Sequence, residues 1–153
     1  MTFRSYMDIA LDEARAAAAR GEVPVGAVIV TPSGAIAARA GNRTRELSDP
    51  TAHAEILAIR AACAALGSER LPGHDLYVTL EPCAMCASAI AATRIARLYY
   101  GAADPKSGGV AIGARVFSHP QCHHVPEIYD GIAATEAETL LKTFFRDRRS
   151  NSE

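Results

Sequence analysis

The sequence predicts an α/β fold, a three-layer α/β/α sandwich, and three observations favour it. Apolar residues recur at helical spacing near both ends of the chain. Between these ends lie short, β-rich runs of strand length. After residue 50, predicted helices and strands alternate, so helices can cover both faces of one sheet. At 153 residues the chain fits a single domain, which we assign to residues 1–150, with 151–153 as a frayed tail.

Each expected element follows from periodicity and from residues that start or stop helices. Asp49-Pro50-Thr51 combines a capping side chain with an early proline, and Gly67 ends the helix that starts there. Pro82 keeps the preceding residue extended, so another helix opens around Cys83. The predicted helices cover residues 3–20, 83–93 and 135–149, and one more helix starts at residues 49–51 and ends at Gly67. The predicted strands cover residues 25–31, 36–40, 76–80 and 95–100, with a short strand near Val116.

Composition is that of an ordinary soluble protein, with 49% apolar and 22% charged residues. No stretch approaches the length of a membrane span, and the first eight residues lack the uninterrupted apolar core of a secretory signal. Two of the four cysteines form a C-x-x-C pattern, which fits a reducing compartment better than a disulfide framework. We therefore expect a cytoplasmic protein with no membrane partner.

Charge is distributed unevenly along the chain. The net charge is −1, so composition alone gives no reason to propose a nucleic-acid partner. Residues 142–149, however, carry Lys142, Arg146, Arg148 and Arg149 against Asp147, a local charge of +3. A basic end of this kind can bind phosphates, and a solvated terminal helix explains it equally well.

Two short motifs carry the chemistry, His53-Ala54-Glu55 and Pro82-Cys83-Ala84-Met85-Cys86. They offer one imidazole and two thiolates to a metal, plus a carboxylate that the metal does not need. Structural zinc normally has four protein ligands, whereas catalytic zinc has three and an open position for water. We expect Zn²⁺ on His53, Cys83 and Cys86, with Glu55 as proton shuttle in a hydrolysis by zinc-activated hydroxide. The arrangement resembles the H-x-E…P-C-x-x-C signature of nucleobase deaminases.

Spacing makes one geometric demand. Cys83 and Cys86 are three apart and share one face of a helix. His53 and Glu55 are two apart and would point in nearly opposite directions inside a helix, so His53 must lie at the helix threshold. Two other interpretations stay open: a redox-active C-x-x-C pair, and a closed structural zinc site. The closed site would recruit a fourth ligand from Cys122, His123 or His124.

Other titratable residues are expected to be structural. Glu81 resembles a second catalytic acid, but the adjacent proline is expected to turn it away from the metal. Cys63 lies on an apolar helical stripe and is expected in the core. The histidines at other positions are expected in turns, in local hydrogen bonds or in contact with a polar partner: His74, His119, His123 and His124.

Longer blocks of sequence resemble the bacterial tRNA-specific adenosine deaminases, and the resemblance spans nearly the whole chain. The zinc-site blocks are shared with cytosine and guanine deaminases, whereas two later blocks are more particular to the tRNA enzymes. The blocks are Val23–Val28, Gly41–Arg43, Thr51–Ile56 and Leu76–Cys86, followed by the two particular ones, Tyr100–Gly108 and Phe144–Arg149.

This resemblance implies a cytidine-deaminase-like fold with a mixed five-stranded sheet, one zinc per subunit and a homodimer. It implies conversion of adenosine to inosine at the wobble position of a tRNA anticodon loop. Asn42 and the Ala54 backbone N–H would hold the flipped adenine. Ala103 stands where many relatives have Arg, and Pro105 stiffens the same loop. The residues implied in contact with the anticodon stem-loop are Asp104, Lys106, Ser107, Phe145 and Arg146.

Two alternative functions remain open at this level. A deaminase for a free base such as guanine or cytosine would use the same zinc motifs but would need no basic end. A non-enzymatic, zinc-stabilised RNA-binding module would use the basic end but would not need Glu55.

Overall fold

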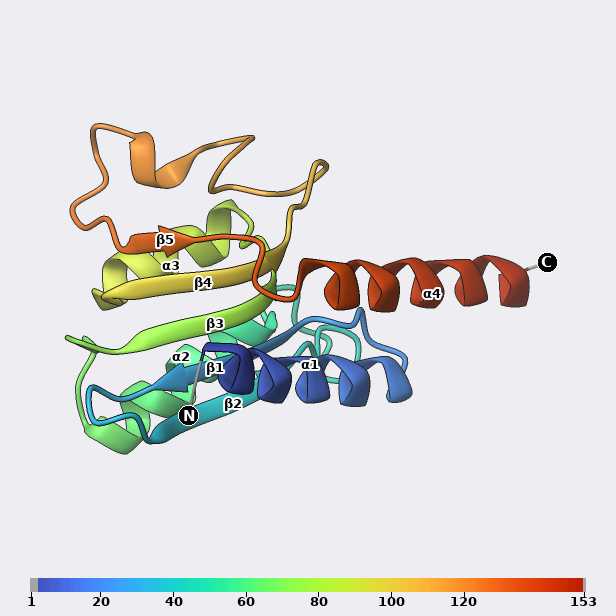
Figure 1. Ribbon diagram of the computed structural model, residues 1–153, viewed down its shortest axis with the longest axis horizontal. Coiled ribbons are helices and arrows are strands. Elements are labelled where there is room, and N and C mark those ends of the chain that lie inside the picture. Colours follow the sequence, from blue (N-terminus) through green and yellow to red (C-terminus); the bar gives the residue numbers. More distant parts are fainter. Residues whose placement is uncertain (1–2, 153) are drawn as a thin grey trace.

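Five strands form one mixed sheet in the order β2-β1-β3-β4-β5 (Figure 1). The computed structural model describes residues 3–152, and their side chains from residue 4 to 149. β1 pairs antiparallel with both β2 and the central β3, while β4 runs parallel to β3 and to β5. The strands are β1 (Gly26–Val30), β2 (Ile36–Gly41), β3 (Asp75–Leu80), β4 (Arg97–Ala102) and β5 (Glu127–Tyr129).

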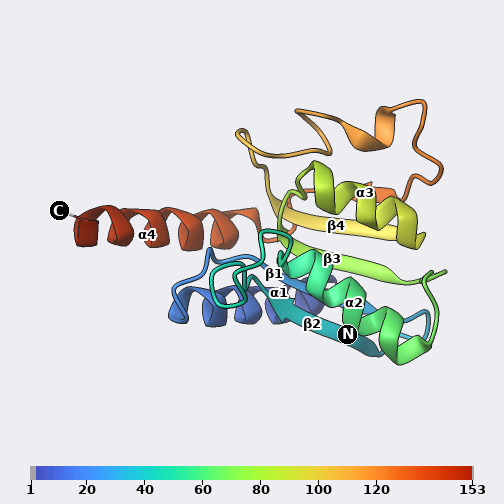
Figure 2. The same cartoon turned by 180° about the vertical axis from the view of Figure 1, so that it is seen from behind.

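Helices cover both faces of the sheet, which confirms the predicted three-layer sandwich. On one face, α2 and α3 lie side by side (Figure 2). On the other face, α1 packs on β1, β2 and β3, and the first part of α4 packs on β4 (Figure 1). The helices are α1 (Phe3–Ala19), α2 (Ala54–Leu66), α3 (Ala84–Thr93) and α4 (Ala134–Ser152), with a short 3-10 helix, η1, at Val116–Ser118.

The main hydrophobic core lies between the sheet and the α2–α3 layer. Val78 of β3, Leu98 of β4 and Ile90 of α3 are completely buried there. A second cluster lies under α1, where Gly26 permits unusually close packing. A Cβ at Gly26 would lie 1.9 Å from the Ala10 carbonyl oxygen, so any side chain there would push α1 off the sheet. The packing of α2 and α3 against the sheet therefore positions the first turns of these two helices.

Two predicted elements differ from the structure, and one observed strand was not predicted. The segment near Val116 is not a strand but η1, because Arg115 before it has a left-handed backbone with φ of 45°. The second helix begins at Ala54 and not at residues 49–51, because Asp49 Oδ1 accepts hydrogen bonds from the Thr51 backbone N–H and hydroxyl in a local turn. The fifth strand is β5, whose three residues are all exposed and give no hydrophobic pattern.

The last helix leaves the sheet and projects from the body (Figures 1 and 2). It continues through Ser152, past the predicted end at Arg149, and Glu153 lies outside the described residues. Among residues 3–152, no helix is both long enough and apolar enough to cross a membrane.

Candidate metal centre and its surroundings

His53, Cys83 and Cys86 form a compact cluster in which the potential ligand atoms all lie within 4.8 Å of one another. His53 Nδ1 is 3.7 Å from Cys83 Sγ and 3.5 Å from Cys86 Sγ. Within the described part of the chain, this is the sole group of three or more His, Cys, Asp or Glu side chains that could hold a metal. One imidazole and two thiolates fit zinc, and three ligands fit a catalytic rather than a closed structural site.

Two helix starts bring these ligands together. His53 is the N-cap residue of α2, with extended φ of −72° and ψ of 154°. Cys83 is the N-cap residue of α3, with φ of −71° and ψ of 175°, and Cys86 lies in the first turn of that helix. The predicted position of His53 at the helix threshold is thus confirmed. Both cysteines lie at the N-terminal end of α3, the positive end of the helix dipole, which favours the thiolate form.

The two cysteines share protons unequally. A hydrogen bond from the Cys86 thiol, and to a smaller extent one from His53, lowers the pKa of Cys83 to about 4. The same hydrogen bond to Cys83, together with burial, raises the pKa of Cys86. The hydrogen bond to Cys83 also raises the pKa of His53. Without a metal the cluster therefore retains protons that a divalent cation would displace on binding.

Glu55 lies in the first turn of α2 and is 4% exposed. Burial raises its carboxyl pKa, since the charged form loses hydration, while the neighbouring His53 and Cys86 act in the opposite direction. The carboxyl thus contacts the ligand cluster without being part of it. A raised pKa makes the carboxylate a better proton acceptor than an ordinary glutamate, which suits a proton shuttle.

Asn42 and the Ala54 backbone N–H lie beside the cluster and bond to each other. The Ala54 N–H donates to Asn42 Oδ1 at 2.8 Å. This bond also satisfies a free N–H at the start of α2, because the His53 side chain makes no capping bond. The side-chain amide of Asn42 keeps its donor group for a ligand.

Sequence reasoning missed Glu22, a buried carboxylate that orders the loop after Asn42. Its Oε1 accepts from the Arg45 N–H at 3.1 Å, and its Oε2 accepts from the Glu46 N–H at 2.9 Å. Burial alone would raise the pKa of Glu22, but these backbone N–H groups and nearby Arg20 and Arg45 lower it overall. The partners are more than twenty residues away, so no local pattern marks the residue.

Replacing Glu22 with Gln is expected to lower the free energy of unfolding by roughly 1–3 kcal/mol at pH 7, the usual value for a hydrogen-bonded charged group. Because the pKa of Glu22 is lower in the folded state, its stabilisation is present above about pH 4.3, the ordinary glutamate pKa, and is lost as the pH falls through the folded value. Urea unfolding of both proteins from pH 7 to pH 3 measures this. A difference that stays constant over this range would contradict the assignment.

A second loop, residues 103–113, which we call the rim loop, packs on the start of α3. Gly108 forms an isolated β-bridge with Cys83, and the Gly109 N–H donates to the Pro82 carbonyl at 2.8 Å. At its tip, Asp104 Oδ1 accepts from the backbone N–H groups of Lys106 and Ser107, both at 3.1 Å. Lys106 and Ser107 are exposed and Asp104 is half-buried. The structure thus places three predicted contact residues in a loop attached to a metal-ligand helix.

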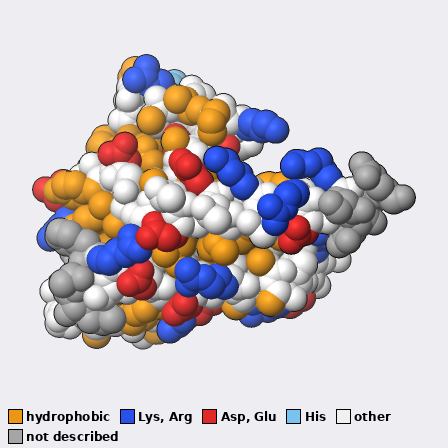
Figure 3. All heavy atoms as spheres, turned by 45° about the vertical axis from the view of Figure 1, so that its right-hand side comes forward, with side chains coloured by type: hydrophobic (Ala, Val, Ile, Leu, Met, Phe, Trp, Pro, Cys, Tyr) orange, Lys and Arg blue, Asp and Glu red, His pale blue; other side chains and the backbone are white. Residues whose placement is uncertain are grey.

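The other two predicted contact residues, Phe145 and Arg146, lie on α4. Phe145 is 44% exposed, and Arg146 pairs with the adjacent Asp147 at 3.5 Å. Arg148 ties this helix to the turn after α1 by donating to the Gly21 carbonyl at 3.2 Å. Lys and Arg side chains gather on this side of the molecule, close to where the chain ends (Figure 3).

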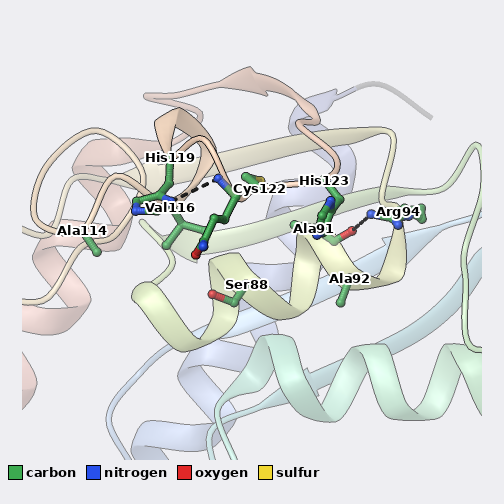
Figure 4. A pocket seen from close by; sticks show the side chains of 10 residues that line it. Ser88, Ala91, Ala92, Arg94, Ala114, Val116, His119, Cys122 and His123 are labelled. Carbon is green, nitrogen blue, oxygen red and sulfur yellow. Dashed lines mark hydrogen bonds between the residues drawn. The ribbon is translucent and has the colours of Figure 1, made fainter.

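The alternative fourth ligands take other partners. Cys122 Sγ donates to the His124 carbonyl at 3.1 Å, and His124 Nε2 donates to the Ile95 carbonyl at 2.7 Å. Cys122 and His123 line a surface pocket of about 510 Å³ beside α3, together with His119 (Figure 4). None of the four belongs to the cluster found among the described residues, so the closed structural site is not supported.

Two further predictions are confirmed. Cys63 is half-buried and packs against the main core. His74 lies in the turn before β3, with Nδ1 2.9 Å from the Pro72 carbonyl oxygen.

Comparison with known proteins gives a consistent result. Residues 2–102 match the family described as the cytidine and deoxycytidylate deaminase zinc-binding region. The chain is 62% identical to the tRNA-specific adenosine deaminase of Agrobacterium fabrum over 144 residues, which cover 94% of each protein. It is 43% identical to the enzyme of the same name from Bacillus subtilis, over 94% of this chain and 89% of the relative.

Solved structures extend this similarity to the fold. A structure from studies of A-to-I editing by tRNA:A34 deaminases at the wobble position of transfer RNA matches with a TM-score of 0.88 and 62% identity, over 90% of this chain and 99% of the other. The guanine deaminase of Bacillus subtilis matches less closely, with a TM-score of 0.68 and 30% identity over 95% of each chain.

Proposed function

Because the chain belongs to the tRNA-specific adenosine deaminases, within the cytidine and deoxycytidylate deaminase family, we propose that it converts adenosine to inosine at the wobble position of a tRNA anticodon loop. The observation that carries this proposal is the buried Glu55 beside a cluster of only three metal ligands. The reaction is a hydrolysis that releases ammonia. The free-base alternative is less well supported, since the guanine deaminase similarity is much weaker.

The cofactor is zinc, and the residues that would hold it are His53, Cys83 and Cys86. When bound, zinc supplies a Lewis acid that lowers the pKa of water to about 7. Glu55 would move two protons in turn. The first passes from the attacking water to a ring nitrogen, and the second passes from the newly added hydroxyl group to the leaving amine, which departs as ammonia. Burial raises the pKa of the Glu55 carboxyl, so its carboxylate accepts a proton more readily than an ordinary glutamate does.

Asn42 and Ala54 would orient the adenine. The side-chain NH2 group of Asn42 can donate a hydrogen bond to the base. Asn42 Oδ1 accepts from the Ala54 N–H, and this N–H could instead donate to the base when substrate binds. Both groups are fixed to the start of α2, the same element that carries Glu55. Base and proton shuttle are therefore positioned by one rigid helix end, which favours a fixed attack geometry.

An anticodon loop suits this site because its bases are already unpaired, so extrusion costs less than from a duplex. The exposed Lys106 and the arginines of α4 would meet phosphates, and Phe145 offers a surface for stacking. We also propose a homodimer, as the resemblance implies, and a cytoplasmic location, where a tRNA substrate would be met.

A substrate panel tests the function. Zinc-loaded protein is incubated with anticodon stem-loop RNA, free adenosine, cytosine and guanine, and ammonia release is followed. We expect release from the stem-loop only. Release from guanine or cytosine, with none from RNA, would instead support a free-base deaminase.

We propose that Asp104 helps the enzyme select RNA over DNA. One carboxylate oxygen already holds the loop tip, and the other can accept from a ribose 2′-OH, which DNA lacks. Asp104→Asn retains an oxygen for the loop but replaces the second acceptor with a donor. The ratio of kcat/KM on matched RNA and DNA stem-loops is expected to fall by roughly 10-fold to 100-fold, the usual range for a charged hydrogen bond. An unchanged ratio would remove this role.

A further inference from the structure

We infer that Glu81 is a positioning residue that holds the rim loop in its substrate-binding shape. The inference rests on the proposed function, because it assigns RNA contact to this loop. Glu81 directly precedes the Pro82-Cys83 ligand segment and is only 2% exposed. It is the second buried carboxylate beside the site, after Glu22, that the deamination chemistry does not use.

Both carboxylate oxygens of Glu81 bind backbone N–H groups of the rim loop. Oε1 accepts from the Asp104 N–H at 3.1 Å. Oε2 accepts from the N–H groups of Val110 at 3.1 Å and of Ala111 at 2.9 Å. The Glu81 side chain therefore connects residue 104, before the loop tip, with residues 110 and 111, after it. With both oxygens engaged and turned toward the loop, Glu81 is not a second catalytic acid, as its sequence context predicted.

Glycines at the base of the loop show how close this packing is. A Cβ at Gly108 would lie 2.6 Å from Glu81 Cδ. A Cβ at Gly109 would lie 2.6 Å from the backbone nitrogen of Ala84, the first residue of α3. A side chain at either position would force the loop to shift, so the loop lies directly on Glu81 and on the start of α3.

As a consequence, the loop tip with Asp104, Lys106 and Ser107 is held at a fixed position relative to Cys83. The backbone of residues 81–83 carries the carboxylate and the metal ligand together, while the carboxylate fixes the loop tip. The geometry links the predicted RNA contacts to the metal centre through a single buried group. Loss of that group should affect how substrate is bound more than how the bound base reacts.

Glu81→Gln tests this inference. Gln has one acceptor oxygen and one amide donor, so at least one set of loop N–H groups loses its partner. On anticodon stem-loop RNA, KM is expected to rise about tenfold or more, while kcat stays within about threefold, the signature of lost binding rather than lost chemistry. Zinc content should remain at one per chain. Amide hydrogen exchange at residues 104, 110 and 111 should become faster.

Charge alone would act in the opposite direction. Removing a negative charge favours binding to RNA, so a higher KM cannot come from the change in net charge. Glu69→Gln, at an exposed position remote from the rim loop in the chain, is the matched control and should leave KM unchanged or slightly lower. Ile29→Val, in the buried centre of β1, controls for general loss of stability and should leave both constants unchanged.

An unchanged KM in folded Glu81→Gln would overturn the inference. So would a fall in kcat with loss of zinc at constant KM, which would make Glu81 a support for the ligand helix only. If Glu81→Gln does not fold, Gly108→Ala displaces the loop while keeping the carboxylate, and the same rise in KM is expected. Wild-type protein that releases no ammonia from the stem-loop would instead contradict the proposed function.

Discussion

Replacing Glu55 with Gln is expected to lower kcat on anticodon stem-loop RNA by about 10²–10⁴-fold, the usual contribution of a positioned acid–base group. The amide has nearly the same shape but cannot take up or deliver a proton at neutral pH. Glu55 is not one of the three clustered ligands, so the variant should bind one zinc per chain. Its Kd for the RNA should also stay close to that of the wild type. Single-turnover kinetics with metal analysis measures all three.

Stability supplies the control for this variant. Burial raises the pKa of Glu55, so its charged form destabilises the fold above the ordinary glutamate pKa. The metal-free Gln variant should therefore have a Tm at neutral pH at least as high as that of the wild type, which excludes unfolding as the cause of lost activity. If kcat fell less than tenfold, another group would carry the proton. If wild-type protein bound RNA without turnover, the RNA-binding module would be favoured.

The ligands of the metal centre were predictable because each of its two motifs is local, although the motifs themselves are thirty residues apart. Asp49-Pro50-Thr51 and Pro82 each signal a nearby helix start, and the ligands His53 and Cys83 are the N-cap residues of the helices that follow. The predicted boundary of α2 was early by a few residues, because Asp49 turns the chain onto Thr51 instead of capping the helix. The predicted position of His53 at the helix start was nevertheless correct. It followed from a separate argument, that a residue two places before Glu55 can share a pocket with it only if it lies at the start of the helix.

The supports around the site were not predictable from local pattern. Glu22 and Glu81 each accept N–H groups from segments more than twenty residues away, and a lone carboxylate in the sequence gives no sign of such partners. Glu81 was correctly expected to face away from the metal, but its actual partners depend on how the rim loop folds back. Likewise β5 pairs with β4 through three exposed residues, so no burial pattern announces it.

Replacing Cys86 with Ala is expected to abolish stable zinc binding and to lower activity by orders of magnitude. Cys86 is completely buried and supplies one of only three ligand side chains, so two would remain for the metal. A site with two protein ligands holds zinc weakly, and the metal would be lost on dialysis. Chelation of the wild-type protein should have the same effect on activity, and added Zn²⁺ should restore the wild type but not the variant.

The other cysteines provide matched controls for this prediction. Cys63 packs against the core, where burial raises its thiol pKa, and Cys122 donates to the His124 carbonyl. Cys63→Ala and Cys122→Ala should each keep one zinc per chain and near-normal turnover. Wild-type protein that stays fully active after stringent chelation would contradict the zinc mechanism. Loss of zinc in a folded Cys122→Ala variant would contradict the assignment of His53, Cys83 and Cys86 as the complete set of protein ligands.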